Sequence, residues 1–259
     1  MRTLIAATLL ATTIVGAASA ESVEQTSAGK PSVSIGGGVM VKPEYSGADT
    51  YDTTGIPVIS AKKEITPGNT IYLQGFQAGV DHSFDDRLTV GAVLSYRGER
   101  DSSDSSRLTG MDDIDAAFEV GPKVRYQLTP QIGLVGTALF DVSDAHDGYT
   151  ARGGADYLLP LSEMTILTLA AGLNYGSDDF NNTYYGVPAA KAIAGRPAYT
   201  ADAGFTNVDA SVAVVHTLTR HWSLTGRVGA DYLIGDSADS PLVDAELQPS
   251  LILGATYKF

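Results

Sequence analysis

Residues 114–128 read IDAAFEVGPKVRYQL, and this stretch decides the fold class. Apolar or small side chains stand at nearly every second position, and the positions between them carry Asp115, Glu119, Lys123 and Arg125. Alternation with a period of two is typical of a β-strand whose two faces meet different surroundings. The polar face therefore points either to bulk water, as in a soluble sandwich, or into the enclosed lumen of a membrane barrel.

The same alternation recurs along most of the chain and matches strands far better than helices. The candidate strands lie near 32–42, 56–63, 70–82, 88–97, 114–127, 131–142, 149–159, 164–175, 206–217, 222–233 and 247–259. Eleven is an odd number, whereas a single bacterial chain forms a barrel with an even number of strands. The segments before residue 85 can each be read as loop or turn, so the missing strand is expected there. We predict an all-β, antiparallel transmembrane barrel of about twelve strands, with ten as the alternative.

The links between the candidate strands alternate in length from residue 98 onward. Short polar links stand at 128–131, 160–163 and 217–221, whereas long acidic links stand at 98–113, 176–204 and 235–246, with a shorter one at 143–148. Short periplasmic turns and long extracellular loops are typical of outer-membrane barrels.

Aromatic side chains gather at the ends of the candidate strands, as interface girdles do. Tyr126 and Trp222 stand on the side of the short turns, and Tyr96, Phe140, Tyr175 and Tyr232 stand on the opposite side. A sandwich core has no reason to sort aromatic residues in this way. The pattern therefore favours a barrel, in which Phe118, Val120 and Val124 face lipid.

The polar faces of the strands then line the lumen. The predicted lumen charge network consists of Asp115, Glu119, Lys123, Arg125, Arg227 and Asp231. Both signs are present, and a barrel of this size has a narrow interior, so that the charges can pair with one another. We expect a largely filled lumen rather than a wide aqueous channel.

The first twenty residues, MRTLIAATLLATTIVGAASA, have the layout of a secretory signal peptide: Arg2, an apolar run, and small residues up to Ala20. The apolar run is too short and too rich in Ala and Thr for a membrane anchor. We expect residues 1–20 to be cleaved, residues 21–31 to form a loose leader, and residues 32–259 to form a single barrel domain.

The composition excludes several classes of function. With 30 acidic and 17 basic residues the formal net charge is −13, which argues against a nucleic-acid partner. Cysteine is absent, so the chain has neither disulfides nor thiolate ligands. No pair of histidines has the spacing of metal ligands on a helix, and acidic loop residues such as Asp112 and Asp113 are interpreted as solvated charges. We predict no metal and no cofactor.

An enzyme is also not expected. A serine hydrolase in the membrane needs a Ser, a His and a carboxylate that converge. In the run Asp81-His82-Ser83, neighbouring side chains of a strand point to opposite faces, so His82 and Ser83 do not meet. His146 is interpreted as a simple loop residue.

The long link at 176–204 carries Ala and Lys between Pro188 and Pro197, which predicts a short helix there. Together with Tyr184, Tyr185 and Tyr199 it is expected to form either a contact surface or plug, or a loop that caps the barrel mouth.

The chain ends in GATYKF, and Tyr257 and Phe259 on an alternating strand resemble the signal that the outer-membrane barrel insertion machinery reads.

Three further stretches, at 36–52, 183–199 and 221–243, resemble the MipA/OmpV family of Gram-negative outer-membrane proteins, and the likeness covers most of the chain. The resemblance implies a barrel in contact with outer-membrane lipid and lipopolysaccharide. The best-described member of the family is a scaffold that brings together a murein lytic transglycosylase and a murein synthase. Other members resemble porins or adhesins, so a small-solute channel and an adhesin remain alternatives.

Overall fold

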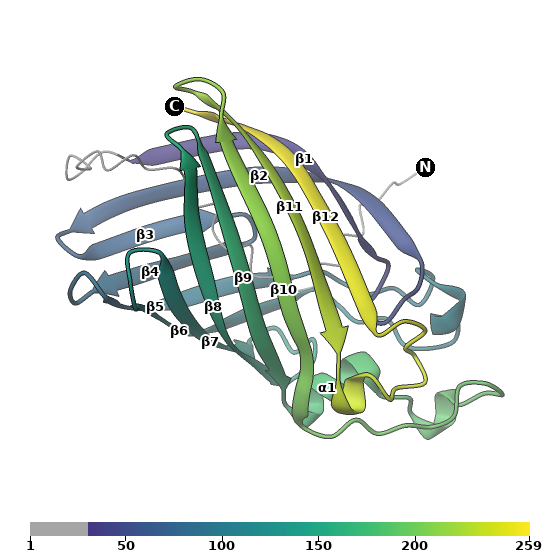
Figure 1. Cartoon of the computed structure of the whole chain (residues 1–259). Coiled ribbons are helices and arrows are strands. Elements are labelled where there is room, and N and C mark those ends of the chain that lie inside the picture. Colours follow the sequence, from purple (N-terminus) through teal and green to yellow (C-terminus); the bar gives the residue numbers. More distant parts are fainter. Residues whose placement is uncertain (1–30) are drawn as a thin grey trace.

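The computed structural model of the protein describes residues 31–259. They form a closed barrel of twelve antiparallel strands, in which sequence neighbours pair and β1 pairs with β12 (Figure 1). The strands are β1 (Ser32–Pro43), β2 (Tyr51–Thr66), β3 (Asn69–Gln74), β4 (Gln77–Ser83), β5 (Leu88–Arg97), β6 (Ala117–Gln127), β7 (Ile132–Asp141), β8 (Tyr149–Ser162), β9 (Thr165–Gly176), β10 (Gly204–Thr217), β11 (Trp222–Leu233) and β12 (Leu247–Lys258). The predicted fold class and strand number are confirmed. The predicted signal peptide and nearly all of the predicted leader lie outside the described residues.

The barrel is apolar outside and polar inside. Val212 on β10 pairs with Leu169 on β9 and Val228 on β11, and all three side chains are exposed on the outer surface. Their inward neighbours, such as Asp209 and Ser211, are buried. Closing the ring pairs most backbone groups of the wall, which is the condition for a sheet to lie in hydrocarbon.

The two ends of the barrel differ. Short turns and the C-terminus lie at one end, and the long loops gather with α1 (Asp178–Tyr185) at the other (Figure 1). The loops also contain three short 3₁₀ helices, η1 (Ser106–Leu108), η2 (Ala189–Lys191) and η3 (Gly235–Ser237). None of the helices within residues 31–259 is both long and apolar enough to cross a bilayer. We call the end with the short turns periplasmic and the end with the long loops extracellular.

The twelfth strand comes from the segment 70–82, which the sequence pattern predicts as one strand. The chain turns back at Gly75 and Phe76, so the segment forms β3 and β4. Gly75 has a φ of 55°, which favours glycine, but the turn lacks the cluster of polar turn residues that would reveal it. Two strand starts also differ from the prediction by three residues or more. β2 begins at Tyr51, before residue 56, and β6 begins at Ala117, after residue 114.

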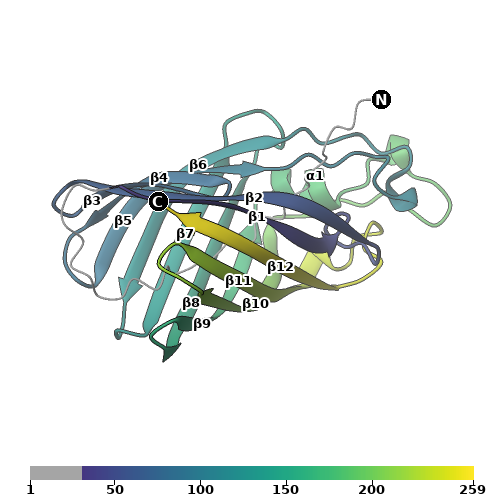
Figure 2. The same cartoon turned by 90° about the horizontal axis from the view of Figure 1, so that it is seen from above.

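Because β3 and β4 are short, β2 continues past them toward the loops with no strand on that side (Figure 2). The Gly75 N–H donates to the Ile59 carbonyl, so the odd-numbered residues of β2 direct their backbone groups to this open edge. Pro57 has no N–H to offer, and the N–H of Thr53 donates to the neighbouring Asp52 carboxylate at 2.7 Å. Proline and local side-chain bonds are how natural sheets protect an unpaired edge.

Candidate functional site

The lumen is lined by ion pairs that span an intervening strand. Lys123 on β6 reaches Asp81 on β4 at 3.0 Å, and Arg125 on β6 binds Asp156 on β8 through two hydrogen bonds of 2.7 and 2.8 Å. Each ion pair passes over a glycine of the strand that lies between its two partner strands. A Cβ at Gly91 would collide with the Asp81 carboxylate, and one at Gly133 with the Arg125 guanidinium. The pairs therefore lie flat against the wall of the barrel.

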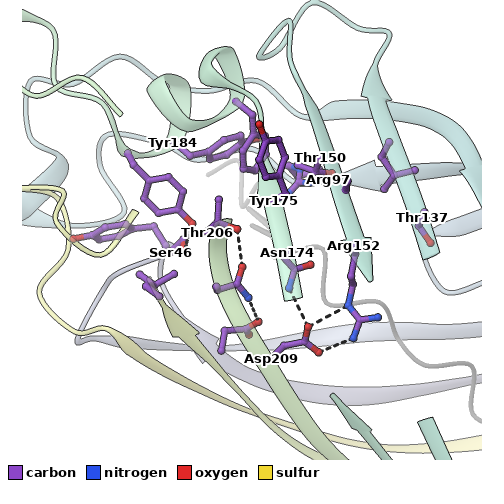
Figure 3. Close-up of a pocket in the computed structure, with 18 of the residues that line it drawn as sticks. Ser46, Arg97, Thr137, Thr150, Arg152, Asn174, Tyr175, Tyr184, Thr206 and Asp209 are labelled. Atoms are coloured by element: carbon purple, nitrogen blue, oxygen red, sulfur yellow. Dashed lines mark hydrogen bonds and ion pairs between the residues drawn. The ribbon is translucent and has the colours of Figure 1, made fainter. Parts of the chain in front are cut away.

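A third pair of the same kind joins Arg152 on β8 to Asp209 on β10, with distances of 3.1 and 2.7 Å (Figure 3). Asn174 on β9 donates to the same carboxylate at 2.9 Å. Asp209 is thus held by three donors and has its charge compensated in place.

A fourth cluster is buried at the extracellular end of the lumen. Glu119 is fully buried and accepts hydrogen bonds from Arg97 at 3.0 and 2.8 Å. His146 Nε2 lies 3.1 Å from the same Glu119 oxygen, and its Nδ1 accepts from the Gly148 N–H. Reading His146 as a simple loop residue was therefore wrong. The link 143–148 turns inward and places its imidazole inside the barrel.

The remaining members of the predicted network are placed differently. Asp231 on β11 is buried and accepts a hydrogen bond from Asn207 at 2.8 Å. Arg227 is buried too, but forms no ion pair within 4.0 Å among residues 31–259. Asp115 does not belong to the lumen. It precedes β6 and its side chain is exposed, because the alternation breaks where the neighbouring Ile114 pairs with Arg100 in the loop.

The extracellular loops close over the barrel in a shared apolar cluster, which we call the cap. It joins residues of four loops that lie far apart in sequence: Tyr45, Ala48, Leu108, Met111, Val187 and Leu242. The Tyr45 hydroxyl donates to the Leu242 carbonyl at 2.8 Å, which ties the first loop to the last. Arg196 is 2% exposed and donates to the carbonyls of Arg107 and Thr109. The cap is therefore a packed layer and not a set of free loops.

Helix α1 fastens the cap to the barrel. Ser177 caps its first turn by accepting from the Phe180 N–H, which explains why it starts there. Phe180 and Tyr184 pack edge-on against His146, and the Arg97 guanidinium lies 4.9 Å from the centre of the Phe180 ring. The short helix predicted between Pro188 and Pro197 is present as the 3₁₀ helix η2. The α-helix of this loop, α1, precedes it and was not predicted.

The three loop tyrosines singled out from the sequence lie in or against a second apolar cluster, which consists of Phe180, Tyr185, Ala201 and Leu233, and Tyr199 also packs against the cap. Tyr185 is buried and its hydroxyl lies 2.9 Å from Ser46, whereas the Tyr199 hydroxyl donates to the Asp236 carbonyl at 2.8 Å. Burial raises the pKa of Tyr184 to about 12 and also raises the pKa values of Tyr185 and Tyr199. These phenols are therefore protonated packing groups.

A cavity of about 100 Å³ lies beneath the cap (Figure 3). Its lining includes Arg97, Arg100, Arg152, Asp209, Tyr184 and Asn174, so it is bounded by the cap above and by the ion-paired wall around it. Within residues 31–259, no group of three or more His, Asp or Glu side chains stands close enough to hold a metal ion.

The aromatic residues predicted for the girdles lie at strand ends. Tyr96, Phe140, Tyr175 and Tyr232 are at the extracellular ends, and Tyr126 and Trp222 are at the periplasmic ends. The structure adds members that sequence reasoning missed, since Phe140 contacts Tyr149, and Tyr175 contacts Tyr149 and Phe205. At the other end, Tyr257 stacks on His221 and packs against Phe259.

Comparison with known proteins places this geometry among outer-membrane proteins. A family model described as "MltA-interacting protein MipA" matches residues 35–259. The outer membrane protein OmpV of Vibrio cholerae is 28% identical over 176 residues, which cover 67% of this chain and 66% of OmpV. The outer membrane protein Omp26La of Vibrio anguillarum is 26% identical over 187 residues, which cover 70% of each chain. The matches thus span about two thirds of the length of these relatives, whose names are those of outer-membrane proteins and not of enzymes.

Among solved structures, the translocator domain of the autotransporter NalP from Neisseria meningitidis has a TM-score of 0.54. The likeness covers 91% of this chain and 90% of that chain at 12% sequence identity. At this identity it shows the fold alone, a closed barrel of the outer membrane.

Proposed function

The chain belongs to the MipA family of outer-membrane proteins, and from this membership we propose that it is a scaffold that holds murein-remodelling enzymes at the outer membrane. The partners are a murein lytic transglycosylase, in keeping with the description of the family, and a murein synthase. In this role the barrel serves as an anchor, and the partners bind on its periplasmic side.

The observation that carries the proposal is the closed extracellular mouth. Loops that are up to 197 residues apart pack into one layer, and ion pairs fill the wall of the lumen beneath it. The packed loops and the ion pairs make the interior of the barrel rigid and leave no wide path for solutes. A membrane anchor for other proteins does not need such a path.

The distribution of charge supports a periplasmic partner. At the periplasmic end five exposed side chains are basic, namely Lys62, Lys63, Arg87, Arg220 and Lys258, and three are acidic, namely Asp85, Asp86 and Glu163. The extracellular loops are predominantly acidic, for example at Asp112, Asp113 and Asp239. Charge complementarity steers association and selects partners, so an acidic partner surface meets less repulsion at the periplasmic end than at the acidic extracellular side.

The experiment is capture of murein enzymes from cross-linked envelopes, read by mass spectrometry. The double substitution Lys62→Glu with Lys63→Glu is expected to reduce capture of the two enzymes, because it reverses charge on the β2–β3 hairpin. The matched control is Asp112→Lys with Asp113→Lys at the extracellular end, which keeps capture intact. A second variant lacking residues 21–31 tests the leader. Failure of the wild type to capture either enzyme would refute the scaffold, and equal capture by the wild type, the rim variant and the leader variant would refute the rim and the leader as its binding surface.

A small-solute channel is a second candidate, favoured by one observation. The cavity beneath the cap includes polar side chains from several strands in its lining, among them Gln77, Asn174 and Asn207. Planar-bilayer recordings decide between the two functions. Conductance by the wild-type barrel supports a channel. The absence of conductance in both the wild type and Arg125→Ala would refute the channel.

A further inference from the structure

One buried cation beneath the cap has no counterion. Arg100, in the loop after β5, is 3% exposed, and its Nη1 donates to the Tyr184 carbonyl at 2.8 Å. It forms no ion pair within 4.0 Å among residues 31–259, although Asp104 lies in the same loop. Burying a charged group without a partner is costly, so a bound anion would offset that cost.

A second donor that lines the same cavity also lacks a partner. The Tyr184 hydroxyl is buried and has no hydrogen-bond partner among the described residues. Both Arg100 and Tyr184 line the cavity beneath the cap. A guanidinium and a phenol that share a cavity form a set of hydrogen-bond donors suited to a carboxylate.

The buried charges of the upper lumen are mostly paired, with a small excess of positive charge. Arg97 is neutralised by Glu119, and Arg152 by Asp209. Among the remaining buried charged side chains of the upper lumen, Lys42, Arg100 and Arg227 are positive and form no ion pair, whereas Asp141 and Asp231 are negative. Lys42, Arg227 and Asp231 line a second, small cavity beside β12, and Asp231 also lines the cavity beneath the cap. Positive charge therefore exceeds negative charge inside a chain that is strongly acidic outside.

We propose that the cavity beneath the cap is a binding site for a small monocarboxylate, whose oxygens accept hydrogen bonds from Arg100 and from the Tyr184 hydroxyl. An engineered cavity of roughly 150 Å³ holds benzene. A cavity of about 100 Å³ therefore fits an acid of the size of acetate or lactate. The site goes beyond the scaffold, because it needs neither murein enzymes nor a conducting lumen.

The test uses the full barrel refolded in detergent and titrated calorimetrically with sodium acetate. Sodium chloride and methylammonium chloride at equal ionic strength are the ligand controls, and inorganic phosphate is a further arm. Saturable binding of acetate, with neither control salt binding, is the expected result. Equal responses to acetate and chloride, or binding of phosphate without acetate, would overturn the proposal.

Variants assign the site to its residues. Arg100→Gln is expected to weaken acetate binding at least about tenfold, and Tyr184→Phe about threefold to tenfold. The matched control is Arg107→Gln, which lies in the same loop but pairs with Asp244 outside the cavity and keeps wild-type affinity. Unchanged affinity in both cavity variants would refute the site. If Arg100→Gln does not fold, Tyr184→Phe and the ligand comparison on the wild type still decide.

Discussion

Arg152 on β8 and Asp209 on β10 touch across Gly172 of the strand between them, which has no side chain to separate them. The same relationship recurs at Gly91 and Gly133, so these glycines are conditions for the ion pairs of the lumen. Backbone freedom is not the reason for them, since all three lie in regular strands. Their value lies in the close approach of neighbouring side chains.

Replacing Gly172 by Ala is therefore expected to destabilise the barrel by about 1–3 kcal/mol, because the new Cβ meets both the Arg152 guanidinium and the Asp209 carboxylate. Urea unfolding of the barrel inserted in phospholipid vesicles measures the effect. Gly153→Ala is the control, since a Cβ there meets nothing within 4 Å. Equal free energies of unfolding for the two variants would contradict this account of Gly172.

A pair of arginine substitutions on β10 tests which face meets lipid. Val212→Arg is expected to cost about 2–4 kcal/mol if the residue lies near the bilayer midplane. Ser211→Arg points into the lumen, opposite the small residues Gly229 and Ala170, and is expected to cost less. The same unfolding assay compares the two, and a reversed order would mean that the inside and outside of the wall are interchanged.

The wall of the barrel was predictable from sequence because its two faces alternate residue by residue. β5 and β11 match their predicted ranges, and β7 and β9 match within a residue or so at each end. The hairpin at Gly75 was missed because the turn between β3 and β4 has apolar and amide neighbours in place of polar turn residues. The alternation of apolar and polar residues predicts the strands, but it does not reveal a turn that lacks the usual turn-forming residues.

The cap and the buried cluster could not be predicted in this way. Tyr45 meets Leu242 across nearly the whole sequence, and no periodicity links the two loops. The inward turn of His146 likewise depends on Glu119 and on the docking of α1. The residues of the predicted lumen charge network other than Asp115 lie on the polar inner face, but their partners depend on which strands lie two apart in the ring.

The cap is expected to loosen when its apolar cluster is cut back. Leu242→Ala removes a fully buried side chain, which costs roughly 2–5 kcal/mol of packing. Limited proteolysis of the cap loops should then be at least about tenfold faster, since each 1.4 kcal/mol is a factor of ten. The control Ile193→Ala alters an exposed side chain of the same loops. Wild-type cleavage of Leu242→Ala would show that the cluster does not hold the cap.

Alkaline pH is expected to release the cap without opening the barrel. Burial raises the pKa of Tyr184 from 10.0 to about 12, so the docked cap keeps the phenol protonated where a released loop ionises. The stability that Tyr184 contributes is complete below pH 10.0 and is lost as the pH rises toward about 12. Near-ultraviolet circular dichroism of the tyrosines should change in this range while the sheet signal stays constant. In Tyr184→Phe the change should be smaller, and an identical titration would count against this role.

The open edge of β2 is expected to stay unpaired because of Pro57. The odd-numbered residues of β2 direct their backbone groups away from β1, so Pro57→Thr adds a hydrogen-bond donor at the edge that a second barrel can use. Self-association in detergent should therefore rise, as measured by analytical ultracentrifugation. Val58→Thr is the matched control, because the amide of residue 58 already faces β1. If Pro57→Thr remains as monomeric as this control, protection of the edge depends on other features, such as the local hydrogen bond between Thr53 and Asp52.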